Sequence, residues 1–197
     1  MAGMHSDRSF IGTWQWARVM LFVIAAPIAC TPSPGEQDKA TGMTVTSTSL
    51  ADGTIPKKHT CDGEGTSPAL AWSTPPAGTQ SYALTMTDLD APVGFLRRHL
   101  FVHWVLYGLP AAARELPAAI PAQEQLADGS RQGKNGINNI GYAGPCPPGT
   151  APHRYAFTLY ALDSKPDLSA AARERELRRA MHGHVVGGGQ LIATFHR

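Results

Sequence analysis

Charge is scarce in this chain and nearly balanced: 16% of its 197 residues are charged, and the formal net charge is +2. A surface that binds nucleic acid normally carries a dense excess of basic residues, so nucleic acid is not expected as a partner. The three cysteines are too few for a disulfide-framework miniprotein and lack the Cys-x-x-Cys spacing of a structural zinc site. His182 and His184 have no third ligand at helical spacing, so no metal is expected.

Motifs of common enzymes are also missing. The sequence contains no Gly-x-Ser-x-Gly elbow, no His-Glu-x-x-His pair and no Gly-rich phosphate loop of the P-loop type. These absences argue against a hydrolase and predict a non-catalytic protein without a cofactor. Glycine and proline, in contrast, are plentiful at 20 and 16 residues, which indicates a globular chain with many tight turns. The length fits one domain.

The N-terminus has the features of an export signal. Arg8 and Arg18 precede an apolar run over residues 19–29, which stops at Cys30. The run is shorter than the roughly 20 apolar residues of a membrane span, but it suits a secretory signal. Its Ile-Ala-Cys ending resembles a bacterial lipobox, in which the cysteine is lipidated. The alternative is an ordinary cleaved signal with an incidental cysteine.

Three segments follow from this interpretation. Residues 1–29 are predicted to be a signal peptide of lipoprotein type. Residues 30–42 are polar and rich in Pro and Gly, which is typical of a flexible tether. Residues 43–197 form the folded domain. The protein is therefore expected to be exported and anchored to a membrane through lipid on Cys30, on the periplasmic or cell-surface side.

The folded domain is predicted to be mainly β. Four segments have β-prone, alternating or continuously apolar character, at residues 81–87, 101–107, 154–162 and 190–195. One helix is expected over residues 169–182, because Leu177 and Met181 form an apolar stripe and Gly183 ends it. Strands separated by Gly/Pro turns favour an antiparallel β-sandwich with a small C-terminal helical part.

Two aspartates directly after the first of these strands are candidates for site chemistry. Asp88 and Asp90 are two residues apart, so their carboxylates share one face if the backbone stays extended, and a shared proton or a bound cation becomes plausible. Pro92 restricts how the chain leaves this segment. The alternative is that the two aspartates cap a turn.

Histidines and a rigid loop supply further candidates. His103 lies within an apolar strand, where an imidazole is either a satisfied core residue or a donor to an anion. His153 and Tyr155 alternate at the start of a strand, so their side chains point the same way. Residues 141–149 hold three glycines and three prolines, among them Gly144 and Pro145, which makes a rigid loop that a ligand can approach closely.

In this order, the motifs Asp-x-Asp-Ala-Pro, His-Trp, Gly-Tyr-x-Gly-Pro-Cys-Pro-Pro and His-Arg-Tyr resemble the phosphatidylethanolamine-binding protein (PEBP) family. The resemblance is closer to its bacterial Raf-kinase-inhibitor-like branch, the YbhB/YbcL type, and covers residues 43–197. It implies a PEBP-like β-sandwich and a shallow pocket for a small anion or a phospholipid headgroup. The pocket residues it implies are Asp88, Asp90, Pro92, His103, Gly144, Pro145, His153 and Tyr155.

The resemblance also places Cys61 and Cys146 in loops around the pocket, and an exported protein meets an oxidising compartment, so a disulfide between them is predicted. The alternative is two separate thiols. Leu89 departs from the family, which usually has proline between the two aspartates, and this change is expected to loosen the turn. The leading hypothesis is a non-catalytic, lipid-anchored binding protein for a small anionic ligand. The alternative is an inhibitor of a protease or kinase that acts through the pocket rim, with an unknown protein target.

Overall fold

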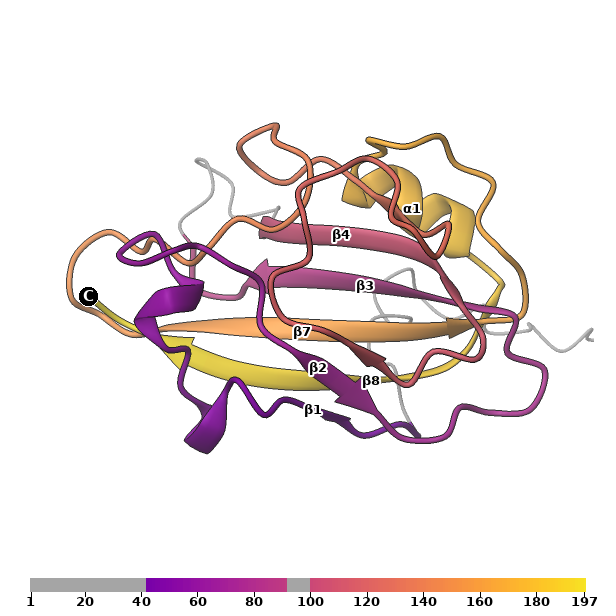
Figure 1. The fold of residues 1–197 in the computed structure, drawn as a ribbon, viewed down its shortest axis with the longest axis horizontal. Helices are drawn as coiled ribbons and strands as arrows, with labels where there is room; N and C mark the ends of the chain where they lie inside the picture. The colour runs from indigo at the N-terminus through magenta and orange to yellow at the C-terminus, as the bar shows by residue number, and fades with distance from the viewer. Residues whose placement is uncertain (1–41, 92–99) are drawn as a thin grey trace, which may run out of the picture. The chain divides into compact units, whose positions relative to one another are not determined.

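The computed structural model describes residues 42–91 and 100–197. Two antiparallel sheets form the domain, one with the strand order β1-β2-β5 and one with the order β6-β4-β3-β7-β8 (Figure 1). The strands span Val45–Thr46 (β1), Leu70–Trp72 (β2), Ser81–Asp88 (β3), Phe101–Pro110 (β4), Glu115–Leu116 (β5), Arg131–Gln132 (β6), His153–Leu162 (β7) and Val185–Phe195 (β8). The helical elements are the 3-10 turns η2 (Ala51–Gly53) and η3 (Lys57–His59), and the helix α1 (Glu174–Met181).

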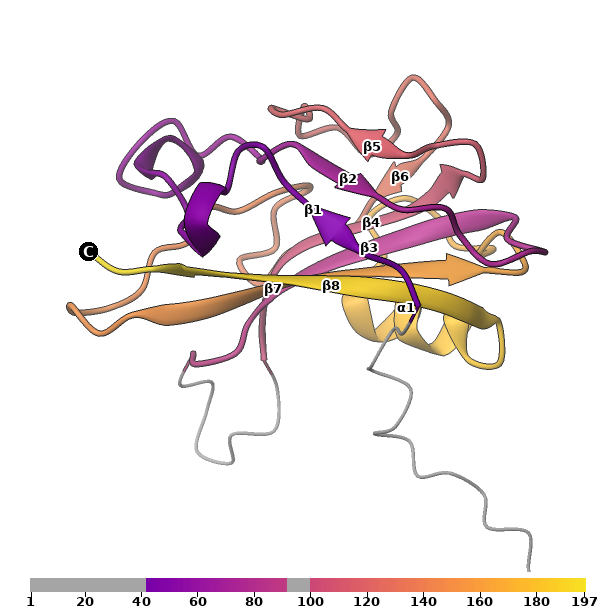
Figure 2. The same ribbon diagram turned by 90° about the horizontal axis from the view of Figure 1, so that it is seen from below.

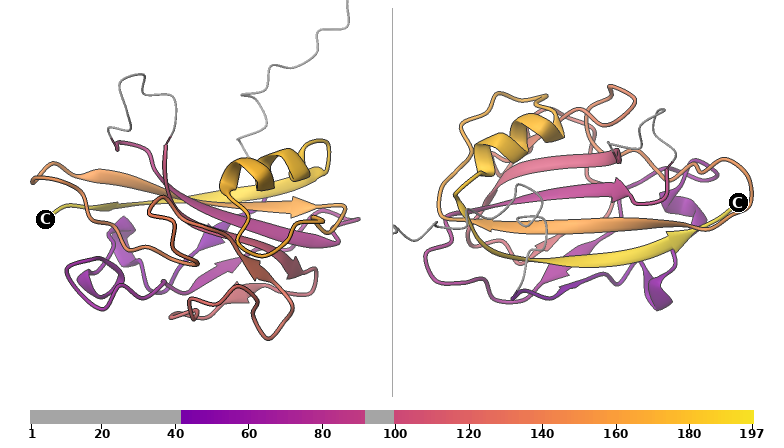
Figure 3. Two further views of the ribbon diagram at one scale, coloured as in Figure 1. Left: turned by 90° about the horizontal axis from the view of Figure 1, so that it is seen from above. Right: turned by 180° about the vertical axis from the view of Figure 1, so that it is seen from behind.

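The five-stranded sheet is covered on both faces, as Figure 2 shows edge-on. The smaller sheet packs on one face, and the core between the two sheets includes Leu84, Met86 and Phe157. Helix α1 covers the other face (Figure 3), where Leu177 and Met181 pack in a second apolar cluster. A strand covered on both sides buries both sets of alternating side chains, and every residue of β3 is buried accordingly.

The expectation of a mainly β sandwich with a C-terminal helical part is confirmed, and the four predicted strands form β3, β4, β7 and β8. Strand β8 begins at Val185, earlier than expected, and contains a run of three glycines, Gly187–Gly189. The Met43 N–H donates to the Gly188 carbonyl at 2.9 Å, and a Cβ on Gly189 would lie 2.2 Å from the Met43 carbonyl oxygen. The glycines therefore let the segment before β1 lie directly on the strand.

The helix is shorter than the sequence predicts, because α1 begins at Glu174 rather than at residue 169. The Ala171 N–H donates to Gln132, and the Ala172 carbonyl accepts from Lys134, so these residues pair with the neighbouring chain instead of forming a helical turn. The helix begins after Arg173, whose N–H donates to the Glu176 carboxylate at 2.7 Å. Pairing across the fold overrides the local helical pattern.

Some of the N-terminal predictions fall outside the structure. The signal peptide over residues 1–29, Cys30 and nearly all of the tether precede the described residues. Within residues 42–91 and 100–197, no helix is both long and apolar enough to span a membrane.

Candidate functional site

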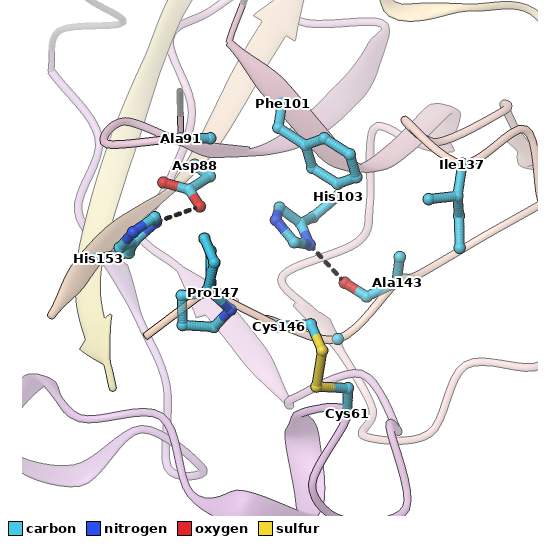
Figure 4. Close-up of a pocket in the computed structure, with 12 residues that line it drawn as sticks. Cys61, Asp88, Ala91, Phe101, His103, Ile137, Ala143, Cys146, Pro147 and His153 are labelled. Atoms are coloured by element: carbon cyan, nitrogen blue, oxygen red, sulfur yellow. Dashed lines mark hydrogen bonds and ion pairs between the residues drawn. A yellow bond between two sulfur atoms is a disulfide. The ribbon is translucent and has the colours of Figure 1, made fainter. Parts of the chain in front are cut away.

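A cavity of about 540 Å³ lies where one end of β3 meets the starts of β4 and β7. Because neighbouring strands are antiparallel, Asp88 at the end of β3 is paired with Phe101 in β4 and with Tyr155 in β7. The cavity is lined by Cys61, Asp88, Ala91, Phe101, His103, Ile137, Ala143, Gly144, Cys146, Pro147, Pro148 and His153 (Figure 4). The strand register therefore brings together motif residues that are far apart in the sequence.

Asp88 and His153 form a buried pair at the cavity wall. The His153 Nδ1–H donates to Asp88 Oδ2 at 2.8 Å, and the second carboxylate oxygen, Oδ1, accepts the Asp90 N–H at 2.8 Å. Both carboxylate oxygens thus have protein donors. This arrangement fixes the His153 ring and leaves its Nε2 without a hydrogen bond to any residue that the structure describes.

His103 faces the same cavity from β4. Its Nδ1 lies 2.8 Å from the Ala143 carbonyl oxygen, which can only accept, so Nδ1 carries the proton (Figure 4). The ring packs between Phe101 and Tyr155, with centroid distances of 4.7 and 5.3 Å. Burial lowers the pKa of His103, while the Ala143 carbonyl and the Asp88 charge act in the opposite direction. The imidazole is therefore held in one orientation and favours its neutral form.

Tyr155 lies behind the cavity wall and is fully buried. Its hydroxyl has no hydrogen-bond partner among the described residues. Burial raises the pKa of Tyr155, and the charge of Asp88 raises it further, so the hydroxyl keeps its proton. A buried hydroxyl without a partner costs about 1–3 kcal/mol of stability. Because it has almost no accessible surface and Tyr155 does not line the cavity, the hydroxyl does not face a bound molecule.

The opposite wall is the glycine- and proline-rich loop. The Pro145 carbonyl accepts the Cys61 N–H at 3.0 Å, and Cys61 and Cys146 form a disulfide with a Cα–Cα distance of 5.4 Å. Gly144 packs so closely that a Cβ there would lie 2.9 Å from the backbone of Thr60. Gly144 lines the cavity, whereas Pro145 supports the wall from behind.

Asp90 does not share a face with Asp88, so the expectation of two neighbouring pocket carboxylates is wrong. The chain bends after Asp88, and the Asp90 carboxylate points to Arg154, accepting from its N–H at 2.8 Å and from Nε at 2.9 Å. The Arg154 guanidinium lowers the pKa of Asp90 from 3.8 to about 2. Asp90 therefore acts on the site through its N–H bond to Asp88 rather than by lining the cavity.

The departure at Leu89 does not loosen this turn. The Leu89 N–H donates to the Arg154 carbonyl at 2.8 Å, a bond that proline could not make. Leucine therefore ties the turn to β7. Pro92, predicted to belong to the pocket, lies outside the described residues.

The sequence interpretation missed most of the apolar lining. Phe101 and Ile137 contribute to the cavity, and Ile137 is 57% exposed. Ile137 carries no local signal, since a turn at Asn135, whose side chain accepts the Ile137 N–H at 3.1 Å, positions it. In the part of the chain that the structure describes, no cluster of three or more His, Cys, Asp or Glu residues is arranged to hold a metal.

The protein is of the β-sandwich class, with two sheets and a partly apolar cavity that is lined by two histidines and a carboxylate. Residues 46–196 match the family model described as phosphatidylethanolamine-binding protein. A UPF0098 protein of Methanothermobacter thermautotrophicus is 42% identical over 145 residues, covering 74% of this chain and 92% of the relative. A UPF0098 protein of Aquifex aeolicus is 38% identical, with coverage of 79% and 89%.

Two solved structures have the same fold. A phosphatidylethanolamine-binding protein homologue of Chlamydia trachomatis is 33% identical with a TM-score of 0.70, covering 79% of this chain and 98% of that one. YbcL of Escherichia coli, described as a member of the mammalian PEBP family, is 27% identical with a TM-score of 0.71, with coverage of 80% and 99%. The chain belongs to the phosphatidylethanolamine-binding protein family.

Proposed function

We propose that this protein is a non-catalytic binding protein whose cavity takes a small anion or a phospholipid headgroup. The observation that carries the proposal is a pair of imidazole nitrogens that face one cavity and have no partner in the described chain: Nε2 of His103 and Nε2 of His153. Buried polar groups are normally paired, so groups left free around a cavity suit a ligand that pairs them.

The composition of the lining supports binding rather than turnover. Among the described residues that line the cavity there is no serine, threonine or lysine, and both cysteines are joined in the disulfide. Asp88 is fully engaged in orienting His153 and in holding the turn. Serine, threonine, lysine and free cysteine nucleophiles are therefore missing from this lining.

Calorimetric titration of O-phosphoethanolamine tests the site. His103→Ala should weaken binding by about 1.5–3 kcal/mol, the usual range for a hydrogen bond to a charged group. The matched control is His184→Ala, because His184 pairs with Asp163 on the exposed surface and does not line the cavity. Equal affinity in wild type and His103→Ala, with both proteins folded, would remove this histidine from the site.

We also propose that the protein is exported and held at a membrane by lipid on Cys30. The basic residues, the short apolar run and the lipobox-like ending support this address, and an exposed disulfide suits an oxidising compartment. Mass spectrometry of the membrane fraction should find a diacylglyceryl mass on Cys30, and Cys30→Ala should release the protein from membranes. An unmodified mature N-terminus at another position would contradict the anchor.

A further inference from the structure

The protons of the two cavity histidines are directed at the protein rather than at the cavity. His103 uses its Nδ1–H for the Ala143 carbonyl, and His153 uses its Nδ1–H for the Asp88 carboxylate (Figure 4). A neutral imidazole has one N–H and one lone pair, so each Nε2 is an acceptor. Neither Nε2 is among the fully buried atoms without a partner, which leaves both in contact with the cavity.

The remaining polar groups do not change the excess of hydrogen-bond acceptors over donors in the cavity. Asp88 is an acceptor whose two oxygens already receive protein N–H groups. The Tyr155 hydroxyl is closed off behind the wall and is not among the groups that line the cavity. The neutral cavity therefore holds two free lone pairs and a carboxylate, but no free side-chain donor among the described residues that line it. A fully ionised phosphate, whose oxygens only accept, pairs poorly with such a wall.

From this inventory, and on the basis of the proposed anion site, we infer that the cavity selects an organic phosphomonoester and binds it together with one proton. A phosphomonoester has a second pKa near about 6, so its dianion readily takes up a proton at neutral pH. The proton then lies between a phosphate oxygen and an imidazole Nε2. Either the P–OH donates to Nε2, or the proton passes to Nε2 and the imidazolium donates back to the phosphate oxygen.

A phosphodiester fits the same wall less well. Its single ionisable oxygen is far too acidic to hold a proton near neutral pH, so it brings acceptors only. Binding would then require protonation of a histidine without help from the ligand. Burial lowers the pKa of His103, which makes that protonation harder. The ester state of the phosphate, rather than its headgroup, therefore determines affinity.

The charged and titratable neighbours of these rings are few in the described chain. His103 is faced by Asp88 from β3 and by His153 and Tyr155 from β7, and the Ala143 loop adds only a carbonyl. His153 is faced by Asp88, with Asp90 and Arg154 beyond it at the strand end. Asp88 favours a proton on His103, whereas a charge on His153 opposes it. One proton for each bound ligand is therefore the expected stoichiometry.

The apolar part of the lining indicates an ester rather than inorganic phosphate. Phe101, Ile137 and Pro148 line the cavity, and Ile137 is exposed to solvent. The volume of about 540 Å³ is within the usual range of small-molecule sites and exceeds what a phosphate group alone requires. The carbon chain of an ester would cover these side chains and remove their apolar surface from water.

The test compares O-phosphoethanolamine with glycerophosphoethanolamine, which share the phosphate and the ammonium group but differ in ester state. Titration near neutral pH, in buffers of different ionisation enthalpy, measures the protons taken up. The monoester should bind at least about tenfold more tightly, with uptake of about one proton per ligand. Equal or tighter binding of the diester, or monoester binding without proton uptake, would overturn the inference. Failure of both compounds to bind would instead contradict the proposed anion site.

Two further experiments distinguish an organic ester from inorganic phosphate, and a lipid from a soluble compound. Hexyl phosphate should bind more tightly than inorganic phosphate, and Ile137→Asn should reduce the ratio of the two affinities. Equal affinity for the two compounds in wild type would contradict the organic ester. Sedimentation with vesicles that contain phosphatidic acid, but not with phosphatidylethanolamine vesicles, would identify a lipid monoester, and binding of the soluble ester alone would identify a soluble one.

Discussion

Tyr82 and Tyr155 lie at opposite ends of the five-stranded sheet and are equally buried, yet their hydroxyls have different surroundings. Tyr82, on β3, donates to the Ala111 carbonyl at 3.3 Å and accepts from Arg114 at 3.0 Å. Tyr155, on β7 beside the cavity, has no hydrogen-bond partner in the described chain. We call the first region, with Ser81, Tyr82 and Leu162, the closed end, and the second, with Asp88, His103, His153 and Tyr155, the pocket end.

The difference shows which part of the sheet serves stability and which part serves binding. At the closed end, the Ser81 hydroxyl also has a partner, the Ser164 carbonyl at 2.5 Å, so the buried polar groups named there are satisfied. At the pocket end, free polar atoms are kept in place by ring packing, the Ala143 carbonyl and the disulfide. Unpaired buried groups cost stability, so they are expected where a ligand completes them.

The largest effect should come from the core of the closed end. Leu162 is fully buried in the cluster beneath α1, and Leu162→Ala should lower the free energy of unfolding by about 2–5 kcal/mol through the cavity it leaves. His103→Ala should cost less, because that ring already borders open space. Urea denaturation of both variants measures the difference. Similar losses of stability in the two variants would contradict the proposal that the closed end serves stability and the pocket end serves binding.

Next in size is the disulfide that holds the pocket end. The double variant Cys61→Ser/Cys146→Ser should be less stable than the oxidised wild type by about 2–4 kcal/mol, because the link closes a long loop with a sequence separation of 85. Since both cysteines line the cavity, ligand affinity should fall as well. Denaturation with and without a dithiol reductant provides the control: reductant should lower the stability of wild type to that of the double variant and leave the variant unchanged.

The strands and the principal site residues could be predicted from the sequence because their signals are local. Alternating and β-prone residues mark β3, β4, β7 and β8, and the motifs place Asp88, His103, His153 and Tyr155 in one family pattern. Antiparallel pairing then brings these residues to the same end of the sheet.

What could not be predicted depends on contacts between distant segments. Asp90 turns outward because Arg154, 64 residues later, binds its carboxylate. The helix starts late because Ala171 pairs with Gln132. Ile137 reaches the cavity through a turn held by the Asn135 side chain. The proton positions on His103 and His153 follow from carbonyl and carboxylate partners that no single segment reveals.

A smaller effect should separate the two tyrosines. Tyr82→Phe should lower the free energy of unfolding by about 1 kcal/mol, because it removes the hydroxyl that donates to the Ala111 carbonyl and accepts from Arg114. Tyr155→Phe should leave stability unchanged or raise it, since the lost hydroxyl had no partner, and it should change O-phosphoethanolamine binding little, because the hydroxyl does not face the cavity. Thermal unfolding combined with titration measures both. A loss of stability in Tyr155→Phe equal to that in Tyr82→Phe would mean that its hydroxyl is paired in the free protein.

The smallest expected effect on stability comes from the turn beside the pocket end and occurs only at acidic pH. Hydrogen bonds and charge from Arg154 lower the pKa of Asp90 from 3.8 to about 2. A carboxyl whose pKa is lower in the folded state stabilises that state above its unfolded pKa, and this contribution is lost as pH falls through the folded value. Stability should therefore decline between pH 3.8 and about pH 2, and Asp90→Asn should show less of this decline. The pair is on the surface, so added salt should reduce the difference. Urea denaturation of wild type and Asp90→Asn across this pH range measures it, and parallel curves would show that Arg154 does not hold Asp90 in solution.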